Sequence, residues 1–373
     1  DAFASAAWRC DAEGFGGFLR RAAQIFWDHP ALPQLLEHRE AARAGPLADA
    51  HEARADRAYL DGKLDVTIAS LTEIIELADA PAEQRARAFN NRGFSYGQRG
   101  SEGDVDRAIG DFTSVIEMPE APAEQRAIAL NNRGFRYGQR GSEGDAERAI
   151  GDYTSVIEMP DAPAEQCAKA LVNRGISYGE RGSEGDFERA IGDYTSVIEM
   201  ADAAAEQRAA ALVNRGVSYF QRESEGDFER AISDFTTVIE MSEALAEKRA
   251  KAFNNRGFSY EQRGSAGDVE HAIGDFTSVI EMSEAPAEQR AIAFNNRGMT
   301  RAQTGSFGAA VEDLLAALAE PALPEDWRTR AGDAIQYIAS AMRICEEPVQ
   351  ELRRDLLARN DLDPEVRDRK STR

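Results

Sequence analysis

A repeat of 41 residues constrains this chain more than any other feature. The tripeptide Asn-Arg-Gly recurs at a fixed interval, so that successive copies of its glycine are 41 residues apart, as from Gly93 to Gly134. These glycines are Gly93, Gly134, Gly175, Gly216, Gly257 and Gly298. A period of roughly 20–50 residues is typical of a stacked array, in which each unit buries its apolar face against its neighbours. The 373 residues are therefore expected to form one elongated array rather than two or three globular domains.

Each copy has the pattern of two antiparallel helices. In the copy that contains Gly134, Pro122 suits a first helical turn, because its missing N–H would be unpaired there in any case. The stretch Gly141–Gly144 can end this helix, and Asp145 is expected to cap the next one. Small and apolar residues recur at intervals of three and four on both sides of this turn. The sequence therefore predicts an all-α fold, an α-solenoid of antiparallel helix pairs.

The repeat divides the chain into three regions. Residues 1–44 do not repeat, and we interpret them either as an N-terminal helical cap or as the tail of an upstream domain. Residues 45–320 hold about seven units, of which five or six are regular and the terminal ones are shorter. Residues 321–373 are predicted to form C-terminal capping helices and a charged tail, because the last apolar face of an array needs a cover.

Helical spacing of apolar residues places particular helices in the flanking regions. One is expected from about Gly14 to Asp28, and a shorter one carries Leu35-Leu36. After the repeats, a helix carrying Trp327 and a final one from Val349 to Leu357 are predicted.

Composition limits the classes of partner. A net charge of −22 argues against nucleic acids and anionic membranes, because both need clustered Lys and Arg, and it favours basic partners. No apolar run approaches the roughly 20 residues that span a bilayer. The three cysteines Cys10, Cys167 and Cys345 are far apart and have no metal-ligand spacing. The simplest interpretation is a protein of the reducing cytoplasm.

The repeat unit resembles the tetratricopeptide repeat family. Residues 129–137 read Ala-Leu-Asn-Asn-Arg-Gly-Phe-Arg-Tyr, and they match the family's small and aromatic positions in order. The family glycine and tyrosine of the first helix fall on Gly134 and Tyr137, and the alanine and aromatic of the second helix fall on Ala149 and Tyr153. The likeness covers about residues 46–320, with about seven residues more per unit than the family's 34. It implies a right-handed superhelix whose first helices line a concave groove for peptides or partner proteins, and a protein that is not an enzyme.

An asparagine lies two residues before each of the six glycines. In some members of the family an asparagine at this place forms a ladder that hydrogen-bonds an extended peptide, and a carboxamide can both donate to and accept from a peptide group. Alternatively, this residue bonds a neighbouring unit and sets the spacing between units. The candidate residues are Asn91, Asn132, Asn173, Asn214, Asn255 and Asn296.

The residue after each glycine is apolar, and in the family this position faces the groove. A contiguous exposed apolar surface marks a contact site; alternatively, these side chains pack on each other. They are Phe94, Phe135, Ile176, Val217, Phe258 and Met299. Beside them Val172 and Val213 replace the asparagines of other copies, which favours an apolar anchor near Ile176 and Val217.

The arginine before each glycine recurs together with an aspartate in the second helix, as in Arg133 and Asp152. Because a guanidinium can bind a carboxylate through two hydrogen bonds, we predict a repeated structural ion pair within a unit or between neighbours. The alternative is a row of arginines for anionic ligands.

Catalysis and cofactors find no support in the sequence. Two Gly-x-Ser-x-Gly matches, at residues 93–97 and 175–179, lie inside a predicted helix rather than at a strand-to-helix turn. The Gly-Ser-Glu-Gly-Asp turns lack the lysine of a phosphate-binding loop and the spacing of a calcium loop, so a helix cap and a solvated turn are the preferred interpretation over a weak calcium site. We expect no catalytic residue, no metal and no cofactor.

These observations predict a non-enzymatic scaffold that binds a protein or peptide partner in its groove. Because the chain starts at Asp1 without methionine, we also interpret it as a piece of a longer polypeptide, which leaves a regulatory or sensor region of a larger signalling protein as an alternative. Self-association of the array through an end or through its apolar stripe is a further alternative.

Overall fold

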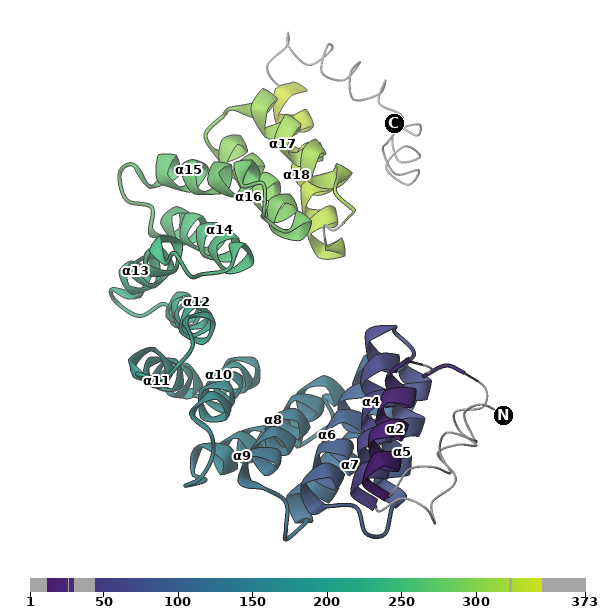
Figure 1. The fold of residues 1–373 in the computed structure, drawn as a ribbon. Helices are drawn as coiled ribbons and strands as arrows, with labels where there is room; N and C mark the ends of the chain where they lie inside the picture. The colour runs from purple at the N-terminus through teal and green to yellow at the C-terminus, as the bar shows by residue number, and fades with distance from the viewer. Residues whose placement is uncertain (1–11, 26, 30–43, 322–323, 344–373) are drawn as a thin grey trace. The chain divides into compact units, whose positions relative to one another are not determined.

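The structure is a computed structural model that describes residues 12–25, 27–29, 44–321 and 324–343 (Figure 1). In these residues the regular secondary structure is helical throughout, which confirms the predicted all-α fold. The expected short helix at Leu35-Leu36, the final helix at Val349–Leu357 and the charged tail lie outside the described residues. The predicted boundaries at residues 44 and 320 stay a prediction.

Seven helix pairs follow one another along the chain. The first helices are α4 (Ala44–Leu60), α6 (Ala82–Arg99), α8 (Ala123–Arg140), α10 (Ala164–Arg181), α12 (Ala205–Arg222), α14 (Ala246–Arg263) and α16 (Ala287–Gln303). The second helices are α5 (Leu64–Glu76), α7 (Asp104–Glu117), α9 (Asp145–Ile157), α11 (Asp186–Glu199), α13 (Asp227–Glu240), α15 (Asp268–Glu281) and α17 (Phe307–Ala319). The helix α2 (Ala12–Ile25) precedes them, two residues earlier than expected, and α18 (Glu325–Arg343) follows them and carries Trp327 as predicted.

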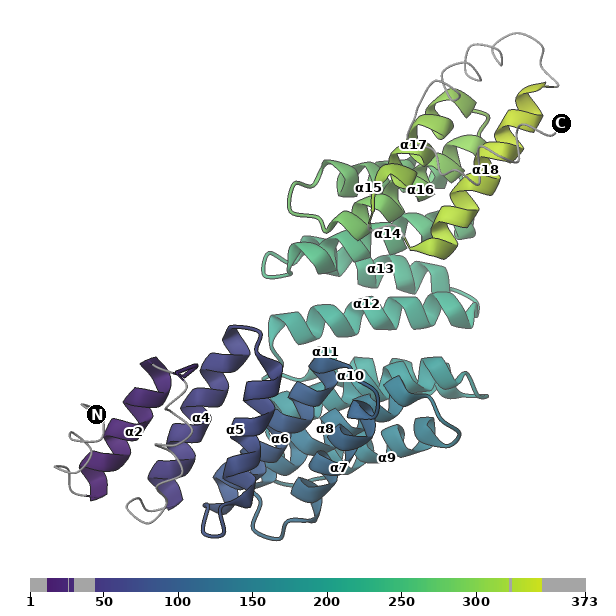
Figure 2. The ribbon, with the colours of Figure 1, turned by 90° about the vertical axis from the view of Figure 1, so that its right-hand side faces the viewer.

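The chain forms two compact parts, which we describe separately. The N-terminal part comprises residues 1–189 and 200–203, and the C-terminal part comprises residues 190–199 and 204–373. Consecutive helices pack on one another from α2 to α10 in the N-terminal part and from α12 to α18 in the C-terminal part, and neighbouring first helices also contact each other, as α6 with α8 and α14 with α16 (Figures 1 and 2). This stacking of helix pairs is an α-solenoid.

The core of each unit is completed by its neighbour. Phe112 and Val115 of α7 are fully buried with Ala86 of α6, and Ala129 of the next first helix packs against them. In the next unit, Ala170 of α10 closes the cluster around Tyr153 in the same way. Because a single helix pair leaves one apolar face open, burial between units supplies much of the stability of such an array.

Glycine permits the close contact of the two helices in a unit. A Cβ atom at Gly134 would lie 2.8 Å from Cε1 and Cζ of Tyr153, a separation that real side chains do not reach. The tripeptide that marks the repeat therefore marks the point where the first helix crosses an aromatic ring of the second.

The turn between the helices differs in detail from the expectation. Gly141 ends α8 in the left-handed conformation, with φ 62°, and its N–H donates to the carbonyl of Tyr137. Gly144 precedes α9 with φ 79°, so that Asp145 is the first helical residue rather than the cap. Its carboxylate instead accepts the backbone N–H of Ser142 at 3.0 Å, which closes the turn.

Candidate interaction surface

The arginine of the repeated tripeptide joins three helices. Nε and Nη2 of Arg133 donate to the two carboxylate oxygens of Asp152 at 2.8 and 2.7 Å. Its Nη1 donates to the hydroxyl of Thr113 in the preceding unit at 3.0 Å. The same three bonds recur at Arg92, Arg215, Arg256 and Arg297.

This arrangement confirms the predicted structural ion pair, and it places the pair within a unit. The hydrogen bonds that Arg133 donates to the Asp152 carboxylate raise the pKa of Arg133 above its usual value. With its nitrogens donating to Asp152 and Thr113, the guanidinium has little left to offer a ligand, so the alternative of an arginine row for anions is not supported.

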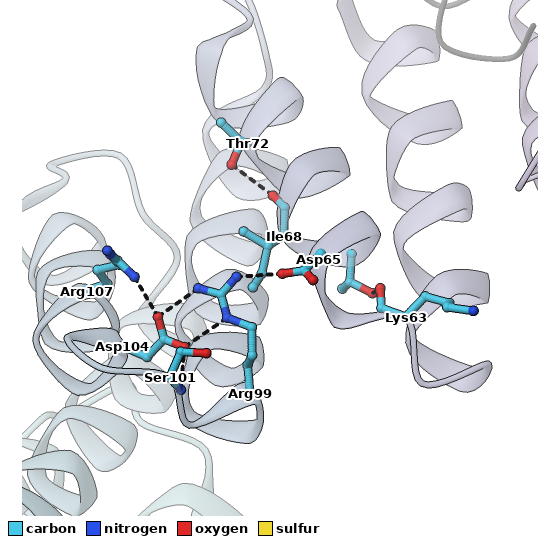
Figure 3. A network of polar contacts seen from close by, with 9 residues as sticks. Lys63, Asp65, Ile68, Thr72, Arg99, Ser101, Asp104 and Arg107 are labelled. Carbon is cyan, nitrogen blue, oxygen red and sulfur yellow. Dashed lines mark hydrogen bonds and ion pairs between the residues drawn. The ribbon is translucent and has the colours of Figure 1, made fainter. Parts of the chain in front are cut away.

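A second charged cluster closes the turn after α6, as Figure 3 shows. The same arginine–aspartate pair recurs in the turns after α8, α10, α12 and α14. Arg99 donates from Nε and Nη2 to the carboxylate of Asp104 at 2.9 and 2.8 Å. Arg107 and the backbone N–H of Ser101 donate to the same carboxylate at 2.8 and 3.0 Å. Nη1 of Arg99 reaches back to Asp65 of α5 at 2.6 Å, so this cluster too connects adjacent units. A carboxylate already held by two arginines is a poor cation ligand, which argues against the calcium alternative.

These hydrogen bonds make the turn sensitive to acid. The Arg99 hydrogen bond, with smaller contributions from Arg107 and Ser101, lowers the pKa of Asp104 from 3.8 to about 2. A carboxylate with a lowered folded-state pKa contributes stability above its unfolded-state pKa and loses it as the pH falls. The contribution of Asp104 is therefore present at neutral pH and disappears between about pH 4 and pH 2.

We expect the Asp104→Asn variant to melt at a lower temperature than the parent chain at neutral pH. The difference should shrink as the pH falls from about 4 to about 2, because the parent loses the charged group there. Circular dichroism melting curves across this range measure the effect. Glu102→Gln removes one charge from the same turn at an exposed position and serves as the control. A constant difference at all pH values would contradict the prediction.

The six candidate asparagines lie on the first helices, and none of them is fully buried. Asn91 is exposed and the other five are half-buried. Within the described part of the chain, none of the six carboxamides donates or accepts a side-chain hydrogen bond. Their role in partner binding stays a prediction.

The bond between units is made by the asparagine one position earlier. Nδ2 of Asn131 donates to the backbone and side-chain oxygens of Gln166 in the next unit, both at 3.1 Å. The same bonds join Asn90 to Gln125 and Asn254 to Gln289. Sequence reasoning placed these residues beside the apolar stripe and missed their bond to the next unit, although an asparagine followed by a glutamine 35 positions later was visible in three units.

The apolar stripe is exposed in some units and packed in others. Phe94, Phe135 and Ile176 of the N-terminal part are 40%, 51% and 38% exposed. In the C-terminal part Val217 and Met299 pack against the core. Phe258 of that part is 41% exposed, although its ring lies 5.2 Å from the ring of Phe220.

Both alternatives for the stripe therefore occur, in different units of the chain. Val213, expected beside the groove, is instead a core residue with 6% exposure, because it packs with Phe235 and Val238. The predicted apolar anchor near Ile176 and Val217 stays a prediction, and Ile176 is exposed.

No protein-family model matches the sequence, and no curated protein matches it either. Solved structures do resemble it. A tetratricopeptide repeat protein from Parabacteroides merdae has a TM-score of 0.53 and 18% identity, over 78% of this chain and 98% of that one. The chain has the tetratricopeptide-repeat fold. Two further structures are more distant. The Cut9–Hcn1 complex has a TM-score of 0.48 and 13% identity, over 97% of this chain and 64% of that one. The Sti1 TPR2AB domain of yeast, complexed with pHSP90, has a TM-score of 0.30 and 17% identity, over 79% of this chain and 98% of that one.

The tetratricopeptide-repeat positions inferred from sequence have the expected places in this fold. Tyr153 is 2% exposed and lies against Gly134, and Ala149 is buried beside it. Tyr137 is half-buried and is surrounded by the guanidinium groups of Arg133, Arg140 and Arg148, 5.3 to 5.9 Å from its ring centre.

Two further features concern the described residues alone. None of their helices combines the length and the apolarity that crossing a bilayer requires. Their histidine, cysteine, aspartate and glutamate side chains do not gather in a group of three or more that could hold a metal ion.

Proposed function

We propose that this chain is a non-enzymatic scaffold that binds a peptide or a partner protein along the first helices of its N-terminal part. The observation that carries the proposal is the exposure of Phe94, Phe135 and Ile176 at equivalent positions of three consecutive first helices. An apolar surface left open on successive units is typical of a contact site, because covering it releases water.

The polar groups beside these side chains support a peptide ligand. Asn91 lies three positions before Phe94 on α6, so both lie on one side of the helix. Asn132 and Asn173 repeat this relation in α8 and α10. A carboxamide with no internal partner can donate to a peptide carbonyl and accept a peptide N–H, whatever side chain the peptide carries. The arginines of the repeat are instead committed to internal aspartates.

The hydroxyl groups of the apparent Gly-x-Ser-x-Gly motif do not favour catalysis. Ser95 lies within α6, and its hydroxyl donates to the carbonyl of Asn91 at 2.8 Å. A serine engaged in this way inside a helix lacks the exposed turn and the base that activate a nucleophile.

The proposal is tested by selecting binders from a random peptide library displayed on phage against the immobilised full chain. We expect enriched peptides, and we expect the triple variant Asn91→Ala, Asn132→Ala, Asn173→Ala to bind them about tenfold or more weakly while keeping its helical circular dichroism, since several hydrogen bonds of about 0.5–1.5 kcal/mol each are lost. The exposed turn variant Glu102→Gln, Glu143→Gln, Glu184→Gln is the matched control.

Two results would count against this function. If the selection enriches no peptide, the chain does not bind peptides as proposed. If the triple variant binds the peptides with unchanged affinity, the asparagines do not take part in binding. Light scattering of the free chain adds a further check. If the measured mass rises with concentration and Phe135→Ser reduces it, the apolar surface serves self-association rather than binding of a partner.

A further inference from the structure

One arginine of the N-terminal part lacks the partner that the repeated arginines have. Arg136 of α8 occupies a position where the equivalent residues of other units are Ser95, Ser177, Ser218, Ser259 and Thr300. It is 6% exposed, so this substitution places a guanidinium group where the other units bury a small hydroxyl.

The surroundings of Arg136 are neutral. Its guanidinium lies over Gly97 of the preceding first helix, in space that the Cβ atom of any other residue would occupy. The group lies 5.3 Å from the centre of the Phe135 ring, and Nη1 donates to the side-chain oxygen of Gln139. Nε is buried without a hydrogen bond. No carboxylate of the described residues pairs with Arg136, and burial alone lowers its pKa.

The neighbouring arginines on α8 show what is missing. Arg133 and Arg140 each donate two hydrogen bonds to one aspartate, Asp152 and Asp145 respectively. A buried guanidinium without such a partner is costly, because it loses hydration and gains no compensating charge. The Phe135 ring beside it is half exposed, so the guanidinium lies just below the surface that we propose for partner binding.

From this contrast we infer that the bound partner supplies the missing carboxylate, and that it places an apolar side chain next to this group on Phe135. The inference rests on the proposed function and specifies the ligand. Because the net charge of −22 repels acidic chains at long range, the carboxylate is a single group in an otherwise neutral or basic segment. A carboxylate on Arg136 would form charge-assisted hydrogen bonds in a site shielded from water.

The test uses peptides enriched on the full chain and a double-mutant cycle. Each peptide is compared with its Asp→Asn or Glu→Gln form, on the parent chain and on the Arg136→Met and Arg136→Ser variants. Methionine keeps an unbranched apolar stem, and serine restores the residue of the other units. An amidated form of each peptide separates a C-terminal carboxylate from a side-chain carboxylate.

We expect removal of the carboxylate and removal of Arg136 each to weaken binding about tenfold or more, and the two losses not to add. The free variants should melt at or above the temperature of the parent chain, since they no longer bury an unpaired charge. Additive losses, or an affinity independent of Arg136, would overturn the inference while leaving peptide binding intact. A lower melting temperature with unchanged binding would assign Arg136 a purely structural role and would overturn it too. If no peptide binds at all, the proposed function fails with it.

Discussion

The variant Asp152→Ala is expected to lower the free energy of unfolding of its part of the chain by about 3 kcal/mol. Removing one member of a buried pair leaves the other charge uncompensated, which costs roughly 3–5 kcal/mol. The lower end applies here, because Arg133 keeps 18% exposure of its side chain and water can partly solvate it. In the preceding unit, burial raises the pKa of the equivalent Asp111 even though Arg92 donates to it.

The effect is best measured by native-state hydrogen exchange, because a solenoid does not unfold as one two-state unit. The amides of α8 and α9 should lose protection. The double variant Arg133→Met, Asp152→Leu is the control, since replacing both charges with apolar groups is often neutral. Thr113→Val removes the bond to the preceding unit together with the hydroxyl's own bond to the carbonyl of Ile109 within α7, and we expect it to cost about 1 kcal/mol. If Asp152→Ala cost no more than Thr113→Val, the pair would not be the main connection.

Gly134→Ala is expected to cost about 2 kcal/mol. The added methyl group would lie 2.8 Å from the Tyr153 ring, and that ring is 2% exposed and cannot move away. Overpacking of this kind costs roughly 1–3 kcal/mol, because the helices must separate or the ring must leave its rotamer.

The same unit contains a matched control. Gly151 of α9 is exposed and helical, and a Cβ atom there would meet nothing within 4 Å. Gly151→Ala should therefore stabilise the chain by about 0.5–1 kcal/mol through helix propensity. Thermal melting of both variants measures these opposite changes in stability. If the two variants changed the melting temperature in the same direction, the close contact at Gly134 would not explain the effect of Gly134→Ala on stability.

The sequence predicted contacts correctly where the same pair of residue types recurs in successive units. Arg133 and Asp152 could be paired from the sequence alone, because both residue types return in every regular unit. The helix pairs followed from the spacing of small and apolar residues. Each of these features depends on the residues of one unit or on a repeated pair.

The sequence was less informative where the outcome depends on which way a side chain points. Asn131 and Asn132 are adjacent, yet one step along a helix turns the side chain by about 100°. That rotation takes Asn131 to the next unit and Asn132 to the surface. Val213 was misplaced for the same reason. The isolation of Arg136 depends on Gly97, which lies on another helix, and no periodicity reveals such a contact.

The contact between residues 97 and 136 also restricts how the gene can change. Near-identical copies invite unequal exchange at the DNA level, which would delete, add or reorder whole units. The copies are not interchangeable, however. Phe220 occupies the place of Gly97 in a later unit, and Glu261 in the next one accepts a hydrogen bond from Thr300. If the copy carrying Arg136 were moved behind the one carrying Phe220, its guanidinium would meet an aromatic ring where it now has an empty space. The order of the copies is therefore constrained by the pairs of residues that contact each other between neighbouring units.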